Sequence, residues 1–427
     1  MSASAGNGAV DDPVNNDETA RAPRVVLGVG AGIAAYKACE VVRGLAESGH
    51  DVRVVPTRSA LEFVGAATFE ALSGNPVHSE VFSNVPEVEH VRIGQEADLV
   101  VVAPATADLL AKAAHGQADD LLTNALLTAR CPVAFFPAMH TEMWEHAATQ
   151  SNVATLRSRG AVVPDPDSGR LTGVDSGKGR MADPAEITDL ARLLIDEPRA
   201  LPRDLEGVHV VVSAGGTREP LDPVRYLGNR SSGRQGYALA RVAAARGARV
   251  TLISAHTTSL PAPAGVTVVN VSTAAELRAA VHEAAPSAEV VVMAAAVADF
   301  RPAALLEHKI KKTEDAPDPV VLDRNADVLA ELVENRRGDQ VIVGFAAETG
   351  DRGSDVLQYG RTKLRRKGSD LLVVNAVGDG RAFEVEENSG WLLAADGAET
   401  AIPFGSKSQL AAALWDSVSE LVGRTHA

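Results

Sequence analysis

Glycine and hydroxyl residues that could bind a phosphate follow the first apolar segment of the chain. In the loop Gly28–Gly32 (GVGAG), missing side chains would let a phosphate approach backbone N–H groups and the positive end of a following helix. The spacing is not GxGxxG, and the next apolar segment ends in Pro56–Ser59 (PTRS), without the acidic residue that binds the ribose of NAD. The loop therefore favours a mononucleotide over a dinucleotide, although a tight turn with close helix packing would also explain the glycines.

Three other groups have side chains suited to chemistry. His90 stands at the start of a predicted helix, and histidine can exchange a proton near neutral pH. The segment Asn229–Gly233 (NRSSG) precedes another predicted helix and could cap it or cradle an anion. The run Lys309–Lys312 (KIKK) could bind a phosphate chain. Each also has a simpler explanation, namely a structural histidine, a capping turn and a solvated surface run.

An alternation of apolar strands and helices must position these residues. Continuous apolar runs such as DLVVVA are typical of parallel strands with helices on both faces. The pattern starts near residue 24 and restarts near 208, after a proline- and charge-rich segment at 196–204. We therefore predict an α/β fold with two Rossmann-like doubly wound domains, whose ligands bind beyond the carboxyl ends of the strands. The expected strands are 25–29, 52–55, 99–103, 133–136, 208–213 and 249–253. One expected helix ends near residue 48, and two others span 120–130 and 234–246.

Length and charge restrict the function further. The 427 residues suffice for two or three domains, and we divide them into a disordered tail (1–22), a first domain (23–198) and a second domain (199–427). The net charge of −15 argues against a nucleic-acid partner and requires a local basic pocket for any anionic ligand. Cys39 and Cys131 lie far apart, which argues against a disulfide scaffold or zinc site and fits a cytoplasmic location. No apolar run reaches the roughly 20 residues that cross a bilayer, so no membrane contact is expected.

Motifs of the first half resemble a known family. GIAAYK (32–37), APATADLLAKAAHGQADDLL (103–122) and PAMHTEMW (137–144) occur in the order and spacing of flavin-dependent cysteine decarboxylases that act on 4'-phosphopantothenoylcysteine. The resemblance implies a flavodoxin-like domain that binds FMN, with His90 as a catalytic residue and His140, Met143 and Arg180 as substrate-binding residues. Flavin would oxidise the substrate thiol to a thioaldehyde, which is the electron sink that decarboxylation needs. The implied FMN-binding residues are Gly30, Gly32, Thr57, Ser59, Ala103, Thr106 and Met139.

Two positions depart from that family. His140 stands where most relatives have asparagine, although an imidazole can still donate a hydrogen bond. The flap 171–181 (LTGVDSGKGRM) has no cysteine where relatives carry one, so the proton for the final reduction would come from water or from Thr172, Asp175 or Ser176. The missing cysteine also leaves a second class open, in which the flavoprotein half has lost turnover and acts as a regulatory binding module. An NAD-dependent reductase is disfavoured by the missing acidic ribose ligand.

Motifs of the second half resemble bacterial phosphopantothenate-cysteine ligases over residues 205–422. DPVRYLGNRSSG (222–233), AAAVADFRP (294–302), KIKK, GFAAET (344–349) and KLRRK (363–367) follow one another in that family's order, and the whole chain resembles the bifunctional CoaBC family. The resemblance implies that the carboxylate of 4'-phosphopantothenate attacks the α-phosphate of CTP, and that the amine of cysteine then displaces CMP from the acyl cytidylate. Mg²⁺, held mainly by the CTP phosphates, would disperse their charge. No protein ligand of the metal is assigned.

The ligase resemblance also implies site residues and an assembly. Asn229 and Lys309 would be catalytic, with Lys309 on the nucleotide phosphates and Asn229 in the cysteine-coupling step. The family's Asn-Pro-Asp turn is Asn-Ala-Asp here (325–327), which keeps both polar residues. FMN sites at trimer contacts, a trimer-based dodecamer and ligase dimers are further implications. The implied CTP-binding residues are Met293, Ala294, Ala295, Asp299, Lys309, Asn325, Asp327, Phe345, Lys363 and Lys367, and the implied phosphopantothenate-binding residues are Asn229, Ser231, Ser232 and Gly233.

Overall fold

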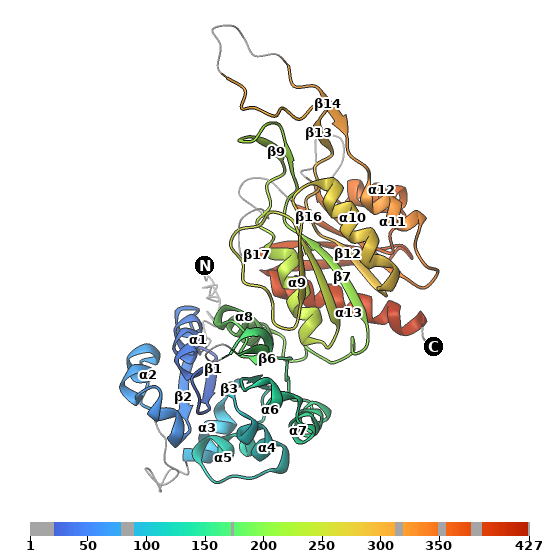
Figure 1. The fold of residues 1–427 in the computed structure, drawn as a ribbon. Coiled ribbons are helices and arrows are strands. Elements are labelled where there is room, and N and C mark those ends of the chain that lie inside the picture. Colours follow the sequence, from blue (N-terminus) through green and yellow to red (C-terminus); the bar gives the residue numbers. More distant parts are fainter. Residues whose placement is uncertain are drawn as a thin grey trace, which may run out of the picture.

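A computed structural model describes residues 21–77, 89–171, 175–311, 319–348, 356–376 and 387–425. Two sheets organise these residues, one in each half of the chain, and helices cover both faces of each sheet (Figure 1). The α/β architecture with two Rossmann-like parts, predicted from the alternation of apolar runs, is confirmed. Within the described residues, no helix is both long and apolar enough to cross a membrane.

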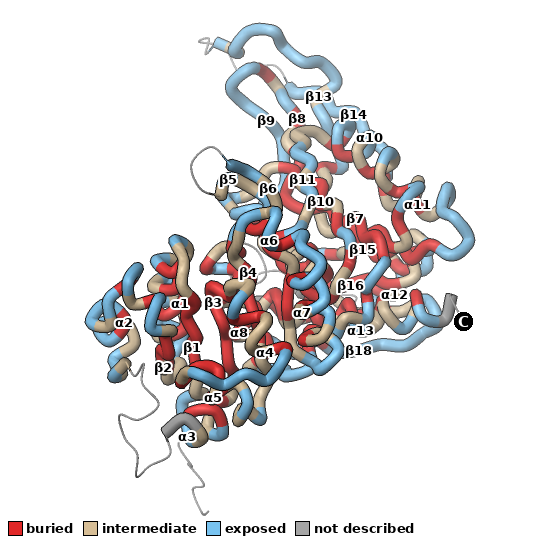
Figure 2. Tube along the Cα trace, turned by 60° about the horizontal axis from the view of Figure 1, so that its bottom comes forward, coloured by how far each residue is buried: buried red, intermediate tan, exposed pale blue. Residues whose placement is uncertain are grey.

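The first half is built on a parallel four-stranded sheet with the strand order β2-β1-β3-β4. This order matches the start of the flavodoxin-like arrangement. Helices α1 and α8 cover one face of the sheet, and α4, α5 and α7 cover the other, so that the strands are buried (Figure 2). The elements are β1 Arg24–Val29, α1 Ala35–Glu47, β2 Asp51–Pro56, a 3-10 turn Arg58–Glu62, α2 Ala66–Ser73, α3 Glu89–Glu96, β3 Leu99–Ala105, α4 Ala107–His115, α5 Leu121–Thr128, β4 Val133–Pro137, α6 Thr141–Glu145, α7 Ala147–Ser158, β5 Asp167–Arg170, β6 Ser176–Arg180 and α8 Pro184–Asp196.

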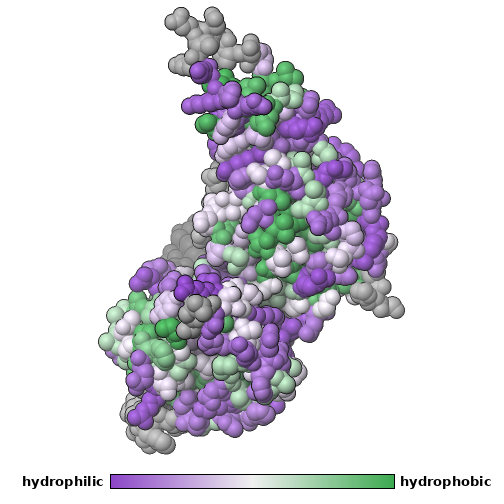
Figure 3. Space-filling model, viewed as in Figure 1, coloured by the Kyte–Doolittle hydropathy of each residue, from purple (hydrophilic) through white to green (hydrophobic). Residues whose placement is uncertain are grey.

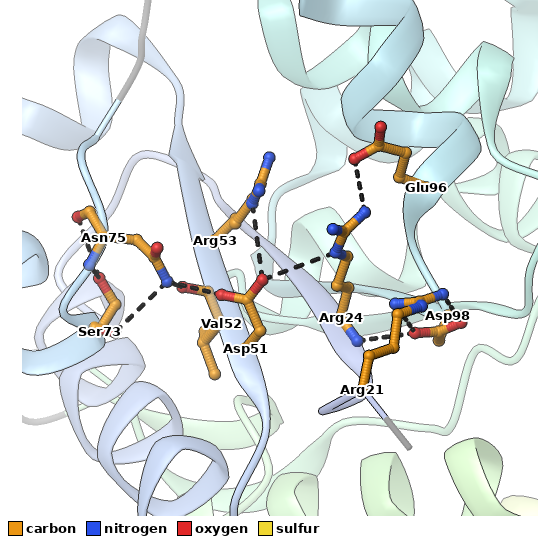
Figure 4. A network of polar contacts seen from close by, with 9 residues as sticks. All are labelled: Arg21, Arg24, Asp51, Val52, Arg53, Ser73, Asn75, Glu96 and Asp98. Carbon is orange, nitrogen blue, oxygen red and sulfur yellow. Dashed lines mark hydrogen bonds and ion pairs between the residues drawn. The ribbon is translucent and has the colours of Figure 1, made fainter. Parts of the chain in front are cut away.

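A polar network ties the amino ends of the first three strands together (Figure 4). The backbone N–H of Arg24 donates to Asp98 at 2.7 Å, and its guanidinium contacts Glu96 at 2.6 Å and Asp51 at 3.8 Å. The amide of Asn75 donates to the same Asp51 carboxylate at 2.8 Å. Because this network lies at the sheet edge opposite the glycine loop, it supports the fold rather than a ligand site.

The second half contains an eight-stranded sheet in the order β11-β10-β7-β12-β15-β16-β17-β18. Its first six strands are parallel, but β17 and β18 are antiparallel, an extension that the strand pattern did not predict. Helices α9 and α13 cover one face, and α10 and α11 cover the other. The elements are β7 His209–Ala214, β8 Arg218–Pro220, β9 Tyr226–Gly228, α9 Arg234–Ala245, β10 Arg249–Ser254, β11 Thr267–Asn270, α10 Ala274–Ala284, a 3-10 turn Ala285–Ser287, β12 Val290–Met293, β13 Phe300–Pro302, β14 Leu322–Arg324, α11 Val328–Glu334, β15 Val341–Glu348, α12 Val356–Lys367, β16 Leu371–Ala376, β17 Glu387–Ala394, β18 Glu399–Ser406 and α13 Lys407–Thr425.

Helix α8 packs against both halves. The core beneath α1 and α8 continues into the core beneath α9 and α13, so one hydrophobic cluster spans the two sheets. Two polar contacts reinforce this junction: Glu186 of α8 accepts the N–H of Ala264 at 3.0 Å, and Asp189 forms a 2.8 Å ion pair with Arg241 of α9. Burial, partly offset by Arg241, raises the pKa of Glu186 to about 7. The junction therefore contains a carboxyl group that titrates near neutral pH.

Candidate functional sites

A cavity of about 1020 Å³ opens beyond the carboxyl ends of the strands in the first half. Its walls come from the glycine loop, the turn after β2, the start of α4, the loop after β4 and the hairpin β5–β6. Cavities of this size hold cofactor-sized ligands. The predicted FMN- and substrate-binding residues that line it are Gly32, Thr57, Ser59, Thr106, Met139, His140, Met143 and Arg180.

The glycines of the first loop have two different roles. A Cβ on Gly28 would lie 2.4 Å from Leu122, and one on Gly30 would lie 2.5 Å from the carbonyl oxygen of Pro104. Packing therefore leaves no room for a side chain at either position. Gly32, in contrast, has a φ of 150° and no atom within 4 Å of an added Cβ. Gly30 and the buried Ala103 therefore stand behind the cavity wall, and Gly32 is the glycine of the loop that faces the open space.

Hydroxyl groups and helix starts on one side of the cavity suit a phosphate. Thr106 begins α4 and accepts the N–H of Leu109 at 3.3 Å, and Thr57 begins the 3-10 turn and accepts the N–H of Ala60 at 3.2 Å. Each hydroxyl still has its own hydrogen to donate. Arg58 adds a positive charge beside them, while Ile33 and Met139 offer apolar surface. The donors and the apolar wall together fit a flavin mononucleotide.

Positive charge collects in this cavity despite the acidic average of the chain. Lys37 and Arg180 both line it, and burial, followed by the charge of Arg180, lowers the pKa of Lys37. Lys112 is already neutralised, because it pairs with Asp108 at 3.2 Å and Asp119 at 3.1 Å. Lys37 and Arg180 therefore provide an electrostatic reason for the cavity to bind an anion.

The hairpin β5–β6 forms the described part of the flap. Its backbone is held against the loop after β4, because the N–H of Met139 donates to the carbonyl oxygen of Gly179 at 2.9 Å. Gly179 has a φ of 146°, and an added Cβ would lie 2.2 Å from the carbonyl oxygen of Met139. Asp175 and Ser176 are exposed, while the predicted proton donor Thr172 lies outside the described residues. The geometry places Arg170 and Arg180 of this hairpin on the cavity wall.

Only the backbone of His90 is described, in the first turn of α3. Its side chain lies outside the described part of the chain, so its catalytic role stays a prediction. Helix α3 itself packs closely on α5, since an added Cβ at Gly94 would lie 2.4 Å from the carbonyl oxygen of Ala125.

Several of the predicted ligase residues lie around the loop after β7, the third strand of the sheet. The backbone of Gly216 bridges His256 on one side and Ala296 on the other, and an added Cβ would lie 2.8 Å from the carbonyl oxygen of Asn229. The amide of Asn229 donates to the carbonyl oxygen of Val297 at 3.0 Å. Loops from three separate motifs therefore meet at the carboxyl edge of the sheet, as the ligand-binding rule for such sheets predicts.

The start of α9 is part of the same edge. Gly233 has a φ of 78°, and its N–H donates to the hydroxyl of Ser231 at 3.3 Å. Ser232 is buried and accepts the N–H of Thr258 through its carbonyl oxygen at 3.2 Å. The predicted phosphopantothenate-binding residues thus lie in the segment that leads into a 12-residue helix, with Gly233 as its N-cap.

Predicted CTP-binding residues continue this edge toward β12. Met293 ends β12, and the N–H of Ala295 donates to the hydroxyl of Ser213 at 3.1 Å. Asn325 is joined to the same loop twice: its amide donates to the carbonyl oxygen of Ala298 at 2.9 Å, and its N–H donates to that of Asp299 at 2.9 Å. The structure therefore brings Met293, Ala294, Ala295, Asp299 and Asn325 together.

A second group lies on α11 and α12. Asp327 caps α11 and forms an ion pair with Lys367, which is one helical turn from Lys363 on α12. Burial would raise the pKa of Asp327, but the hydrogen bonds from Lys367 and from the backbone N–H of Ala330, together with the positive charges of α12, outweigh burial and lower the pKa. Phe345 lies in β15, one residue beyond the position paired with Met293. Lys309 is exposed in the segment between β13 and β14.

Two features of this half were not assigned a role from the sequence. Asp222 and Arg225 belong to the DPVR segment. Their hydrogen bonds with Ile310, 85 or more residues away, form only in the tertiary structure. His256 donates or accepts a 2.8 Å hydrogen bond with Ser272 beside Gly216, and burial, followed by Arg218, lowers its pKa. Among the described residues, no group of three or more His, Cys, Asp and Glu side chains could hold a metal ion.

The fold and the grouped residues define an α/β protein with a candidate ligand site at the carboxyl edge of the sheet in each half. Residues 13–195 match the family described as Flavoprotein, and residues 205–422 match the DNA/pantothenate metabolism flavoprotein C-terminal domain. The coenzyme A biosynthesis bifunctional protein CoaBC of Mycolicibacterium smegmatis is 65% identical over 401 residues, 93% of this chain and 97% of that one. The CoaBC protein of Bacillus subtilis is 40% identical over 405 residues, 94% of this chain and 98% of that one.

The chain belongs to the CoaBC family of bifunctional coenzyme A biosynthesis proteins. One solved structure that it resembles is the C-terminal domain of a CoaBC protein, with 32% identity, 52% of this chain and 99% of that chain covered, and a TM-score of 0.44. Another is a PPC decarboxylase variant complexed with pantothenoylaminoethenethiol, with 29% identity, 42% of this chain and all of that chain covered, and a TM-score of 0.39.

Proposed function

We propose that the chain catalyses two successive reactions of coenzyme A biosynthesis. Residues 199–427 join 4'-phosphopantothenate to cysteine at the expense of CTP, and residues 23–198 decarboxylate the product to 4'-phosphopantetheine with FMN. The observation that carries this proposal is the position of predicted residues at the carboxyl edges of both sheets: eight line one cavity of the first half, and Asn229 and the loop after β12 lie around Gly216 in the second.

In the first half, protein groups bind and orient the reactants. FMN, when bound, supplies the oxidation of the substrate thiol that makes loss of carbon dioxide feasible. Thr57, Ser59 and Thr106 would hold its phosphate, while Gly30 and Ala103 shape the wall behind it. Lys37 and Arg180 attract the anionic substrate, and the flap held at Met139 limits the access of water. His90 exchanges the thiol proton, and His140 and Met143 contact the substrate.

In the second half, cations and helix starts neutralise the reacting phosphates. Ser231, Ser232 and Gly233 offer hydroxyls and the amino terminus of α9 to 4'-phosphopantothenate. Lys309, Lys363 and Lys367 bind the triphosphate of CTP, and Mg²⁺ is carried in mainly by those phosphates. The residues of the β12 loop, with Asn325, Asp327 and Phe345, enclose the nucleoside. Asn229 orients the acyl cytidylate for attack by the amine of cysteine.

Exposed apolar side chains support an oligomer. Ile33, Tyr36 and Met143, which are 66%, 55% and 47% exposed, surround the mouth of the first cavity. A second exposed group lies on the arm formed by β8, β9, β13 and β14, where apolar residues stand out among polar ones (Figure 3). We assign the first group to trimer contacts and the arm to ligase dimers, which together make a dodecamer. The two free thiols are in keeping with a cytoplasmic location.

The full chain provides the decisive test. Supplied with 4'-phosphopantothenate, cysteine, CTP and Mg²⁺, the yellow protein should release one pyrophosphate and one carbon dioxide for each 4'-phosphopantetheine. Replacing CTP by ATP measures nucleotide selectivity. A protein that binds flavin and makes pyrophosphate, but releases no carbon dioxide, would support the alternative in which the first half is a regulatory binding module.

Three substitutions separate the steps. His90→Asn should retain FMN and ligation but release no carbon dioxide, whereas normal decarboxylation would remove His90 from the mechanism. Lys309→Gln should lower pyrophosphate formation by roughly 100-fold or more, because it removes a charge-assisted contact to the phosphates. Asn229→Asp should accumulate acyl cytidylate, detected by mass spectrometry; an equal slowing of activation and cysteine capture would make Asn229 structural.

A further inference from the structure

A buried carboxylate fixes the turn between β8 and β9. The side chain of Asp222 is 0% exposed. One oxygen accepts the backbone N–H groups of Val224 at 2.8 Å and Arg225 at 2.9 Å. The other accepts the guanidinium of Arg225 at 3.0 Å and 2.6 Å and the backbone N–H of Ile310 at 3.1 Å. Four of these five hydrogen bonds are local, and the fifth joins the turn to the KIKK segment.

Arg225 completes the connection from the other side of Ile310. Its Nη2 donates to the carbonyl oxygen of Ile310 at 3.1 Å, so both backbone groups of that residue are held. A further backbone bond, from Leu306 to the carbonyl oxygen of Leu221 at 3.2 Å, aligns the preceding residues with the same turn. Ile310 stands directly between Lys309 and Lys311. The backbone of this cationic segment is therefore held against the hairpin, although the side chains of Lys309 and Lys311 are exposed. We call the two hydrogen bonds of the Ile310 backbone, to Asp222 and to Arg225, the clip.

The charge of Asp222 makes the clip persistent. Burial would raise the pKa of its carboxyl, but the Arg225 guanidinium and the three N–H donors outweigh burial and hold the pKa well below its usual range. The carboxylate thus stays ionised at neutral pH. Hydrogen bonds to an ionised group are roughly twice as strong as neutral ones. Breaking the clip would also remove the Ile310 N–H, one of the five hydrogen bonds that stabilise this enclosed carboxylate.

We propose that Asp222 is a positioning residue for Lys309 and acts on the nucleotide reaction only through the clipped backbone of Ile310. This inference rests on the proposed role of Lys309 at the CTP phosphates. A free lysine-rich loop must lose backbone and side-chain entropy when it binds a triphosphate, whereas a clipped backbone has lost the backbone part beforehand. Asp222 therefore determines CTP affinity without touching CTP.

The first measurement needs no nucleotide. Asp222→Asn replaces an acceptor oxygen by a donor amide and removes the charge that holds Arg225. Trypsin should then cleave after Lys309 about tenfold faster in the otherwise folded full chain, because local opening governs cleavage. Asp323→Asn is the matched control, since Asp323 lies exposed on β14 of the same arm and loses the same charge. An unchanged cleavage rate in Asp222→Asn would overturn the clip.

The second measurement uses kinetics. In Asp222→Asn, the KM for CTP should rise about 10- to 100-fold, while kcat at saturating CTP should change less than about threefold. The double variant Asp222→Asn, Lys309→Gln should have the same KM as Lys309→Gln alone, because the two residues act through one contact. Additive effects would overturn the proposal, since Asp222 would then act independently of Lys309.

Folding and the proposed function are tested separately. Release of carbon dioxide from supplied 4'-phosphopantothenoylcysteine should be unchanged in Asp222→Asn and reports an intact first half. If Asp222→Asn does not fold, Arg225→Gln removes the contact to the Ile310 carbonyl oxygen and must give the same cleavage and KM changes. Faster cleavage in Asp222→Asn, together with a normal KM for CTP in Lys309→Gln, would support the clip but disprove the nucleotide role of Lys309. That result would overturn the positioning role of Asp222.

Discussion

Docking of the flap depends on one glycine, which can be tested by Gly179→Ala. The added Cβ would lie 2.2 Å from the carbonyl oxygen of Met139, so the two backbones must separate by about 1 Å to reach an ordinary contact of about 3.2 Å. At that separation the 2.9 Å hydrogen bond between Met139 and Gly179 is lost, which costs about 1 kcal/mol. Alanine at a φ of 146° adds about 1–2 kcal/mol of strain.

The ratio of docked to undocked flap should therefore fall by about 30- to 150-fold, from about 2–3 kcal/mol in total. We expect release of carbon dioxide from 4'-phosphopantothenoylcysteine to fall by the same factor, while CTP-dependent pyrophosphate release stays within twofold of the parent as an internal control. Gly169→Ala is the matched variant, because its Cβ would meet only the flexible side chain of Arg180 at 3.2 Å. Decarboxylation within threefold of the parent in Gly179→Ala would refute the argument that a docked flap is needed.

Three further predictions concern stability and proton transfer. Arg246 is fully buried and pairs with two partly exposed aspartates. In thermal unfolding, Arg246→Met should therefore destabilise the second half by about 2–3 kcal/mol, whereas Arg278→Met, at an exposed ion pair, should cost less than about 0.5 kcal/mol. Equal losses of stability in the two variants would contradict this. Burial raises the pKa of Glu186 from 4.5 to about 7, so the stability linked to its proton is complete below pH 4.5 and is lost as the pH rises through 7. Glu186→Gln should remove that loss, worth up to about 3 kcal/mol, and thermal midpoints at pH 5 and pH 8 that change equally in parent and variant would disprove the linkage. The double variant Cys39→Ser, Cys131→Ser should still release 4'-phosphopantetheine, because neither thiol lines the cavity and burial raises the pKa of both; an enethiol that accumulates in the variant alone would identify one of them as a proton donor.

The elements that could be predicted from the sequence are those with local signals. The parallel strands are continuous apolar runs, and the strand expected at 99–103 is wholly buried as β3 Leu99–Ala105. Thr106, expected to contact a cofactor, also caps α4, which is why a hydroxyl followed by a helical pattern locates the cavity edge. Both sites were expected at the carboxyl ends of strands, where the structure places part of each candidate set: the residues that line the first cavity, and Asn229 with the loop after β12.

Features that depend on tertiary contacts could not be predicted. The glycine loop was expected to approach a phosphate, but Gly28 and Gly30 are required by the packing of Leu122 and Pro104, and only the backbone geometry separates them from Gly32. The KIKK run was consistent with either a surface or a phosphate clamp, and its connection to Asp222 spans 88 residues. The antiparallel strands β17 and β18 alternate polar and apolar residues too weakly to be distinguished from loops by pattern.

Burial at the junction between the halves also could not be predicted from the sequence. The segment at 196–204 has the prolines and charges of a linker, and it still joins two topologically separate sheets. Ala200 and Leu201 are nevertheless 5% and 6% exposed, and Asp204 is held by the buried Arg246 at 2.8 Å and 2.5 Å. The amino-acid composition of a segment indicates where the chain can turn, whereas its burial depends on the helices that pack against the segment. Because one hydrophobic cluster crosses this junction, separating the halves would expose apolar surface on both, so their topological independence does not imply independent stability.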